Sequence, residues 1–88
     1  MKQRVLANSD ILEVELAAPP GHQHLRAVLR LRNHEELVLQ EATLANLVRA
    51  YVTVKTHPTL RGVQLVGRKL RQENIKEGFA VWQLLEKE

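Results

Sequence analysis

Two stretches near the N-terminus alternate between apolar and polar side chains. Residues 11–17 (ILEVELA) and 24–32 (HLRAVLRLR) both place leucine, valine or alanine at every second position. A period of two is typical of β-strands that bury one face. Between them lies Pro20-Gly21, which suits the centre of a type II turn because proline fixes φ and glycine accepts a positive φ. We therefore predict an antiparallel hairpin.

The charged residues select one register for this hairpin. With Ala17 opposite His24, the two apolar rows meet on one face of the sheet, and Glu15 meets Arg26 on the other face. A slip by one residue would set arginines against leucines. The sequence therefore predicts that glutamates of the first strand neutralise part of the arginine row on the second.

The next segment, residues 33–40 (NHEELVLQ), has two interpretations. A turn at Asn33-His34 would lead into a short strand at 36–40. Alternatively, Asn33 and Glu36 have the spacing of a helical capping box. We favour the strand, because leucine and valine alternate there in a β-rich run and the helical pattern strengthens only later.

A helix is predicted at about residues 41–56. Its apolar residues recur at positions i, i+3, i+4, i+7 and i+8, which is typical of an amphipathic helix with one buried face. Pro58 disfavours α-helical geometry at His57, so the helix should end near Thr56. The residues of this apolar stripe are Leu44, Leu47, Val48, Tyr51 and Val52.

Residues 61–71 are predicted to form a further strand. Gly67 is a candidate for a β-bulge, since glycine inside a strand often marks one. One extra residue at that point would bring Leu70 onto the same side as Leu65 and would turn Lys69 outward.

The C-terminal segment at 75–86 also has two interpretations. Asn74 and Glu77 have capping-box spacing, and apolar residues follow at helical intervals, so we favour a helix. The alternative is a strand after a hairpin turn at Gly78, because residues 79–85 (FAVWQLL) are nearly all apolar.

These elements predict an α+β fold in a single domain, residues 1–88. A small antiparallel β-sheet would be packed on one face by the amphipathic helix at about 41–56, and a C-terminal helix or strand would complete the core. The core must be aliphatic, because the chain has 15 Leu, 10 Val and 2 Ile but one Phe, one Trp and one Tyr.

Positive charge is unevenly distributed along the chain. Residues 42–72 hold six basic and no acidic residues, or +6, whereas the other 57 residues hold seven basic and ten acidic residues, or −3. Such asymmetry is typical of proteins that bind nucleic acid. The basic residues that could contact a phosphate backbone are Arg49, Arg61, Arg68, Lys69 and Arg71. However, the segment lacks aromatic side chains free for base stacking, because Tyr51 belongs to the helix's apolar stripe.

The residue types needed for catalysis or metal binding are poorly represented. His22 and His24 could share one side of an extended segment, as paired ligands do, but no third ligand lies nearby in the sequence. Ser9 and Asp10 are adjacent in a segment typical of a turn, so they do not suggest a catalytic triad. We therefore predict no catalytic residue, no metal site and no cofactor, and we identify no site for a small molecule.

The chain contains no cysteine, which removes disulfides and thiolate chemistry. No apolar run approaches the ~20 residues of a membrane-spanning helix. Asp10 and Glu13 interrupt any apolar stretch near the N-terminus before it reaches the length of a signal peptide. We therefore expect a cytoplasmic protein with no membrane partner.

Two of the three aromatic residues lie near the C-terminus. Phe79, Trp82 and Leu85 belong to the nearly all-apolar run 79–85, which in a small protein needs cover on more than one side. They could form a subunit interface, where aromatic side chains are enriched. The sequence thus favours a non-enzymatic protein-interaction module that forms a homodimer. The alternative is a nucleic-acid-binding protein that uses the basic segment 49–71.

Overall fold

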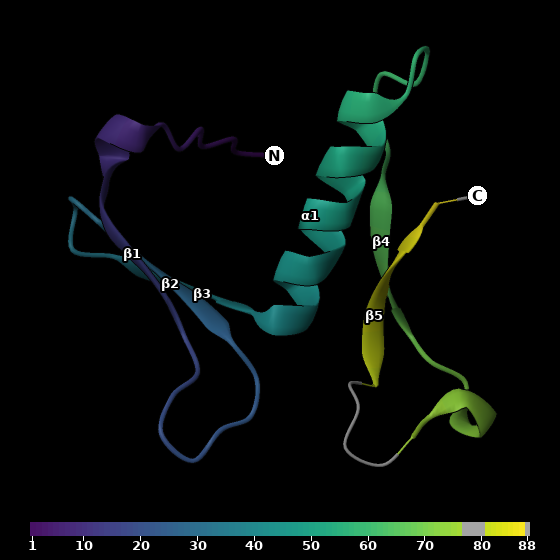
Figure 1. Cartoon of the computed structure of the whole chain (residues 1–88). Coiled ribbons are helices and arrows are strands. Elements are labelled where there is room, and N and C mark those ends of the chain that lie inside the picture. Colours follow the sequence, from purple (N-terminus) through teal and green to yellow (C-terminus); the bar gives the residue numbers. More distant parts are fainter. Residues whose placement is uncertain (77–80, 88) are drawn as a thin grey trace. The chain divides into compact units, whose positions relative to one another are not determined.

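Antiparallel strands and one long helix make up the part of the chain that the structure describes (Figure 1). This computed structural model describes residues 1–76 and 81–87. It divides into two compact units, Met1–Glu41 and Ala42–Glu88. The elements in chain order are η1 (Asn8–Asp10), β1 (Ile11–Ala17), β2 (Arg26–Leu31), β3 (Glu36–Gln40), α1 (Glu41–Thr56), β4 (Leu65–Lys69), η2 (Gln72–Asn74) and β5 (Trp82–Glu86).

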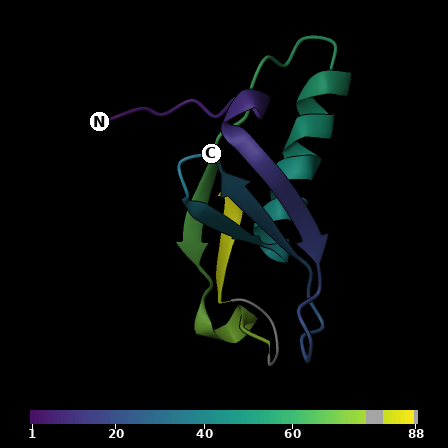
Figure 2. The same cartoon turned by 90° about the vertical axis from the view of Figure 1, so that its left-hand side faces the viewer.

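The predicted α+β class is confirmed. The N-terminal unit is a three-stranded antiparallel sheet in the order β1-β2-β3, and the C-terminal unit contains α1 and the antiparallel pair β4-β5 (Figures 1 and 2). The strand predicted at 36–40 and the helix predicted at 41–56 have the expected bounds. That residues 1–88 form a single domain stays a prediction.

The turn between β1 and β2 is centred where the sequence predicts it. The amide of His22 donates a hydrogen bond to the carbonyl of Pro19 (3.0 Å), and Gly21 has a φ of 80°. A positive φ at the third residue is what a type II turn requires, so glycine is needed there.

The predicted register of this hairpin is wrong by two residues. Ala17 lies opposite Arg26, not opposite His24. The chain bends at Gln23 and His24, and this adds two residues to the β2 side of the loop. Because the side-chain period of a strand is two, the shift leaves every side chain on its expected face and changes only its partners.

A β-bulge interrupts β1 at Leu12. Ile11 lies opposite Leu31, and Glu13 lies opposite Arg30, so two residues of β1 span one step of β2. The extra residue reverses the side to which Ile11 points. As a result, Ile11 shares the apolar face with Leu31 and is half-buried, whereas the alternating pattern placed it on the face of the glutamates.

A three-residue turn joins β2 to β3. The amide of Leu31 donates to the carbonyl of Glu35 (2.9 Å), and the amide of His34 donates to the carbonyl of Leu31 (3.1 Å). His34 has a φ of 70°, and it is the only residue other than glycine with a positive φ in the described ranges 1–76 and 81–87. Such a left-handed residue at the end of a three-residue loop lets the two strands keep their twist.

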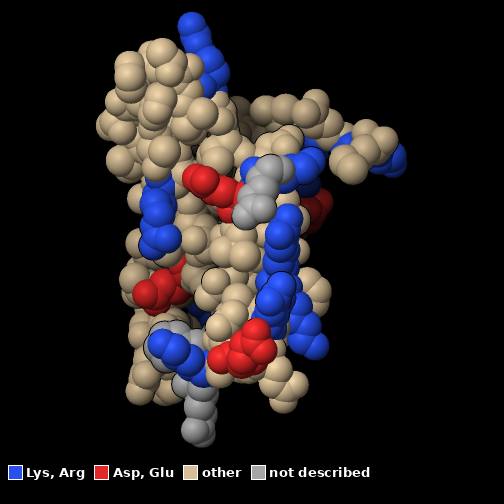
Figure 3. Space-filling view, turned by 90° about the vertical axis from the view of Figure 1, so that its right-hand side faces the viewer, with Lys and Arg blue, Asp and Glu red and all other residues tan. Residues whose placement is uncertain are grey.

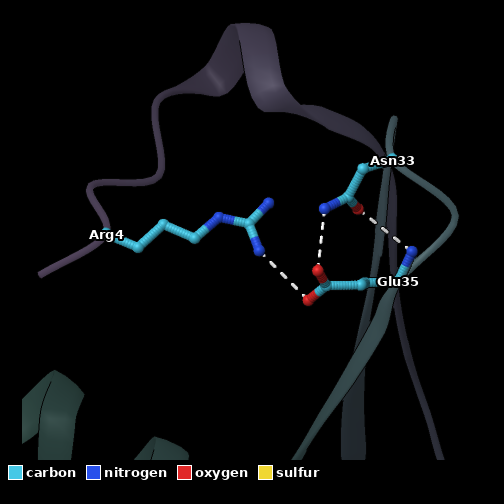
Figure 4. Close-up of polar contacts among 3 residues, drawn as sticks. All are labelled: Arg4, Asn33 and Glu35. Carbon is cyan, nitrogen blue, oxygen red and sulfur yellow. Dashed lines mark hydrogen bonds and ion pairs between the residues drawn. The ribbon is translucent and has the colours of Figure 1, made fainter. Parts of the chain in front are cut away.

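Glu35 connects this turn to the N-terminal segment (Figure 4). Its carboxylate accepts hydrogen bonds from Arg4 Nη1 (3.0 Å) and Asn33 Nδ2 (2.8 Å), while its amide donates to Asn33 Oδ1 (3.0 Å). Arg4 and Glu35 are half exposed, and exposed ion pairs contribute at most about 1 kcal/mol. Their contact therefore orders the surface more than it stabilises the fold.

Replacing His34 with glycine is expected to raise the free energy of unfolding by about 0.5 kcal/mol. A left-handed conformation costs a non-glycine residue roughly 1–2 kcal/mol, and glycine's greater freedom in the unfolded chain offsets part of that gain. Urea unfolding at a fixed protein concentration measures the change. His34→Val is the matched comparison and should destabilise the protein, because a β-branched side chain is poorly tolerated at a positive φ. A destabilised glycine variant would contradict this account.

The helix α1 ends as predicted, at Thr56. None of its residues is buried; in the apolar stripe Leu44 is half-buried, and the other four residues are 47–64% exposed. After Thr56, His57 Nδ1 accepts hydrogen bonds from the amides of Thr59 (3.1 Å) and Leu60 (2.8 Å). These bonds shape the turn that leads away from the helix, next to Pro58.

The C-terminal hairpin differs from two predictions. The helix favoured at 75–86 is wrong, and β5 is instead the strand of the alternative interpretation, paired antiparallel with β4. The pairing runs without interruption past Gly67, so the predicted bulge is also wrong. Two backbone hydrogen bonds extend the ladder at its ends: the amide of Leu70 donates to the carbonyl of Val81 (2.7 Å), and the amide of Lys87 donates to the carbonyl of Gln64 (2.9 Å). The turn predicted at Gly78 lies outside the described residues.

Candidate interaction surfaces

The basic residues of the hairpin point in different directions. Arg68 lies opposite Gln83, and Lys69 lies opposite Trp82. Successive side chains of a strand point to opposite faces, so Arg68 and Lys69 lie on opposite faces of this two-stranded sheet. A bulge at Gly67 would have placed Lys69 on the side opposite to Leu65, but the ladder is regular and the two residues lie on the same side. The two adjacent charges therefore do not act together on one flat surface.

The remaining basic residues predicted to contact nucleic acid come from three different segments. Arg49 lies on α1, Arg61 lies in the loop after it, and Arg71 lies just before η2. Arg71 Nη1 is 4.0 Å from Glu73, and both side chains are largely exposed. Among the residues that the structure describes, the other four predicted cations have no carboxylate within 4.0 Å: Arg49, Arg61, Arg68 and Lys69.

The charge of the two units differs in sign. Residues 42–88 hold eight basic and four acidic residues, or +4, and residues 1–41 hold five basic and six acidic residues, or −1. In the view of Figure 3, lysine and arginine side chains form several separate groups, with acidic side chains beside some of them. Nucleic-acid binding stays a prediction of the sequence, and the register of β4 gives it no continuous basic face.

The arginine row of β2 is partly neutralised by a glutamate of β1, as expected, and also by a glutamate of β3. Arg30 Nη1 donates a hydrogen bond to Glu13 Oε1 (2.7 Å), and Arg30 Nε lies 3.4 Å from Glu36 Oε2. The predicted pair Glu15–Arg26 is not formed, because the two-residue shift puts Glu15 opposite Val28. The bond to the Glu13 carboxylate raises the pKa of Arg30 above its usual value. This triad links all three strands on one face.

The residues considered for metal binding or catalysis have local structural roles. Asp10 Oδ2 accepts a hydrogen bond from the amide of Ala7 (2.9 Å), which places it in the short η1 turn. His24 Nδ1 lies 3.7 Å from Glu41 Oε2, and the same carboxylate oxygen accepts the amide of Leu25. Within residues 1–76 and 81–87, no group of three His, Asp or Glu side chains could hold a metal ion.

The predicted interface residues do not lie on one face. Pairing with β4 places Trp82 and Leu84 on the side of Leu65, and Leu85 on the other side with Val66. Trp82 is 63% exposed. Phe79 lies outside the described residues. A role for these residues in self-association stays a prediction.

The apolar face of the three-stranded sheet is a surface that sequence reasoning assigned to the core. Ala27 and Leu31, on the central strand β2, are the only buried hydrophobic residues in the described part of the chain. On the edge strand β1, Val14 and Leu16 are 56% and 61% exposed. The alternating pattern identified this face correctly, but it could not show that the edge strands would stay uncovered.

No helix in the described ranges is long and apolar enough to span a lipid bilayer. In comparisons with known proteins, the chain matches no protein-family model, and no curated protein or solved structure shows significant similarity to it. The function is therefore inferred from the surfaces described above.

Proposed function

We propose that the protein is a non-enzymatic interaction module that associates with a second copy of itself. One observation carries this proposal. Two hydrophobic residues are buried in the described part of the chain, whereas sixteen large hydrophobic residues are exposed. Exposed apolar surface on this scale is typical of protein–protein interfaces.

The exposed residues belong to both units. These exposed fractions hold for the two units together, and a side chain in a unit by itself can only be more exposed. Neither unit by itself therefore covers these residues. Eleven of the sixteen lie in strands or the helix: Leu12, Val14, Leu16, Leu37 and Val38 in the sheet, Leu47, Val48, Tyr51 and Val52 on α1, and Trp82 and Leu85 on β5. A two-stranded hairpin such as β4-β5 is at best marginally stable in water without cover.

The expected energies are sufficient for a stable dimer. Full burial of a large apolar side chain contributes about 1.5–3 kcal/mol. The exposed side chains are about half covered already, so each would contribute about half of that value on association. Twelve of them, six from each copy, would contribute roughly 9–18 kcal/mol, against an association cost of about 4–15 kcal/mol. A second copy is the favoured partner because symmetric two-fold dimers are the commonest assemblies of soluble proteins.

Sedimentation equilibrium of the full chain tests this proposal. We expect a mass twice the 10.1 kDa of one chain. Concentrations of about 1–100 µM are suitable, because a binding free energy near −8 kcal/mol corresponds to a Kd of about 1 µM. Trp82 is the only tryptophan, so its emission should shift to shorter wavelength as the dimer forms and covers the ring. A chain that stays monomeric over this range would refute the proposal.

A further inference from the structure

The strand β3 has one side free for pairing. It lies at the edge of the sheet and pairs only with β2 in the described part of the chain. The bond between the Leu31 amide and the Glu35 carbonyl fixes the alternation of hydrogen-bonded pairs along β2 and β3. Leu37 and Leu39 therefore direct their peptide groups toward β2. The residues that direct theirs away from the sheet are Glu36, Val38 and Gln40.

The sequence of this edge is complementary to itself. In an antiparallel pair with its two-fold axis at Val38, Val38 faces its own copy, and Leu37 faces Leu39. Glu36 then faces Gln40 of the second copy, so no two like charges meet. In this register Glu36, Val38 and Gln40 face one another, as hydrogen-bonded pairs require. The amide of Gln40 is directed to the second copy, whereas its carbonyl, as that of the residue before α1, also accepts the first hydrogen bond of the helix.

We propose that β3 pairs with β3 of a second copy, joining two three-stranded sheets into one six-stranded antiparallel sheet. This inference rests on the self-association proposed above and names one contact through which it occurs. Leu37 and Val38 are 40% and 49% exposed, so the contact would cover apolar surface on both faces of the edge. Such an interface is isologous and closes after two copies.

The opposite edge of the same sheet is protected against this pairing. Two copies of β1 aligned about Val14 would set Glu13 against Glu15, and alignment about Glu15 would set that residue against its own copy. The bulge at Leu12 also distorts this edge. Charges and bulges are two ways in which natural edge strands avoid self-pairing. In contrast, β3 has no lysine, proline, glycine or bulge.

Two opposite substitutions at Gln40 test the inference. Gln40→Glu places two pairs of glutamates across the two-fold axis and should weaken the dimer about fivefold. Gln40→Lys places a lysine opposite Glu36 twice and should tighten the dimer about fivefold at low salt, with the gain lost at high salt. The measurement is the dimer Kd by sedimentation. Gln40 and Glu36 are both exposed, so neither variant disturbs the core.

The stability of the monomer should change in the opposite direction to the affinity of the dimer. Within one chain, Gln40 lies opposite Arg26 of β2. The glutamate variant should therefore unfold at slightly higher urea concentration under monomeric conditions, and the lysine variant at slightly lower concentration. If the more stable monomer variant, Gln40→Glu, also formed the tighter dimer, the inference would be overturned. The change in Kd would then come from the stability of the fold and not from a contact between two copies of β3.

The outcomes separate the inference from the proposed function. A dimeric wild type whose Kd rises with Gln40→Glu and falls with Gln40→Lys supports both. A dimeric wild type with the same Kd in both variants overturns the β3 contact and leaves self-association standing. A monomeric wild type refutes self-association itself, and the β3 contact with it.

Discussion

Leu31→Ala is expected to lower the free energy of unfolding by about 3 kcal/mol, because truncation of a buried leucine loses its transfer free energy and leaves a cavity. Leu31 is 2% exposed, and besides it only Ala27 is a buried hydrophobic residue in the described part of the chain. It lies opposite Ile11 on β1, and its amide closes the turn to β3. Loss of its side chain therefore removes packing from the central strand, at the end of the sheet next to the turn.

Chemical unfolding followed by circular dichroism measures this change. All variants are compared at one protein concentration, because association with a second copy shifts the apparent stability. Leu12→Ala is the matched control: it removes the same atoms from the same sheet, but Leu12 is 60% exposed, so its loss should cost less than about 1 kcal/mol. Equal effects of the two substitutions would show that Leu31 is not the packing centre.

Trp82→Ala should weaken self-association at least about 30-fold. Tryptophan at the centre of an interface typically contributes about 2 kcal/mol or more, which corresponds to this factor in Kd. Trp82 shares its face of β4-β5 with Leu65 and Leu84 and is 63% exposed. Within one chain so exposed a ring contributes little, so a large effect requires that a partner covers it.

Sedimentation velocity and circular dichroism together separate loss of association from loss of structure. Trp82→Phe should keep most of the affinity, because it keeps an aromatic ring on the same face. Leu85→Ala is the control on the opposite face of the same strand, where it lies beside Val66. A Trp82→Ala variant that is folded and has an unchanged Kd would exclude this face from the interface and leave the β3 edge as the site of contact.

The charge pattern is compatible with the proposed association through β3. On the face that carries Glu13, Arg30 and Glu36, the arginine of the central strand bridges to a glutamate on each side. Arg30 therefore neutralises part of the negative charge of Glu36 at the edge of β3. In the proposed pair, Gln40 of the second copy would face this partly neutralised carboxylate, and its uncharged amide side chain tolerates that neighbour.

Local features of the fold follow from the sequence alone. Pro20-Gly21 forms the predicted turn, the alternating residues form β1 and β2, and Pro58 ends α1 at Thr56. Each of these depends on backbone angles and hydrogen bonds within a few residues, so neighbouring residue types are sufficient to predict it. The apolar and charged faces of the strands are predictable for the same reason, because side-chain direction alternates with a fixed period.

The partners of each strand depend on the tertiary structure. The bends at Gln23 and His24 shift the β1–β2 register by two, and the bulge at Leu12 turns Ile11 to the other face. Residues 82–86 have apolar spacing compatible with a helix, and pairing with β4 makes them a strand. That change separates Trp82 from Leu85. Pairing between distant segments decides these features, and no local pattern encodes how many residues a loop adds.

The exposure of the apolar residues also required the tertiary structure. The sequence shows which residues are apolar and which share a face, and it predicts that Leu47 and Val48 belong to one stripe of α1. Burial, however, depends on whether another surface covers that face, and most apolar side chains of the described chain are not covered by their own unit. The physical reason is that a pattern fixes the direction of a side chain, whereas its contacts depend on what the rest of the chain, or a second copy, places against it.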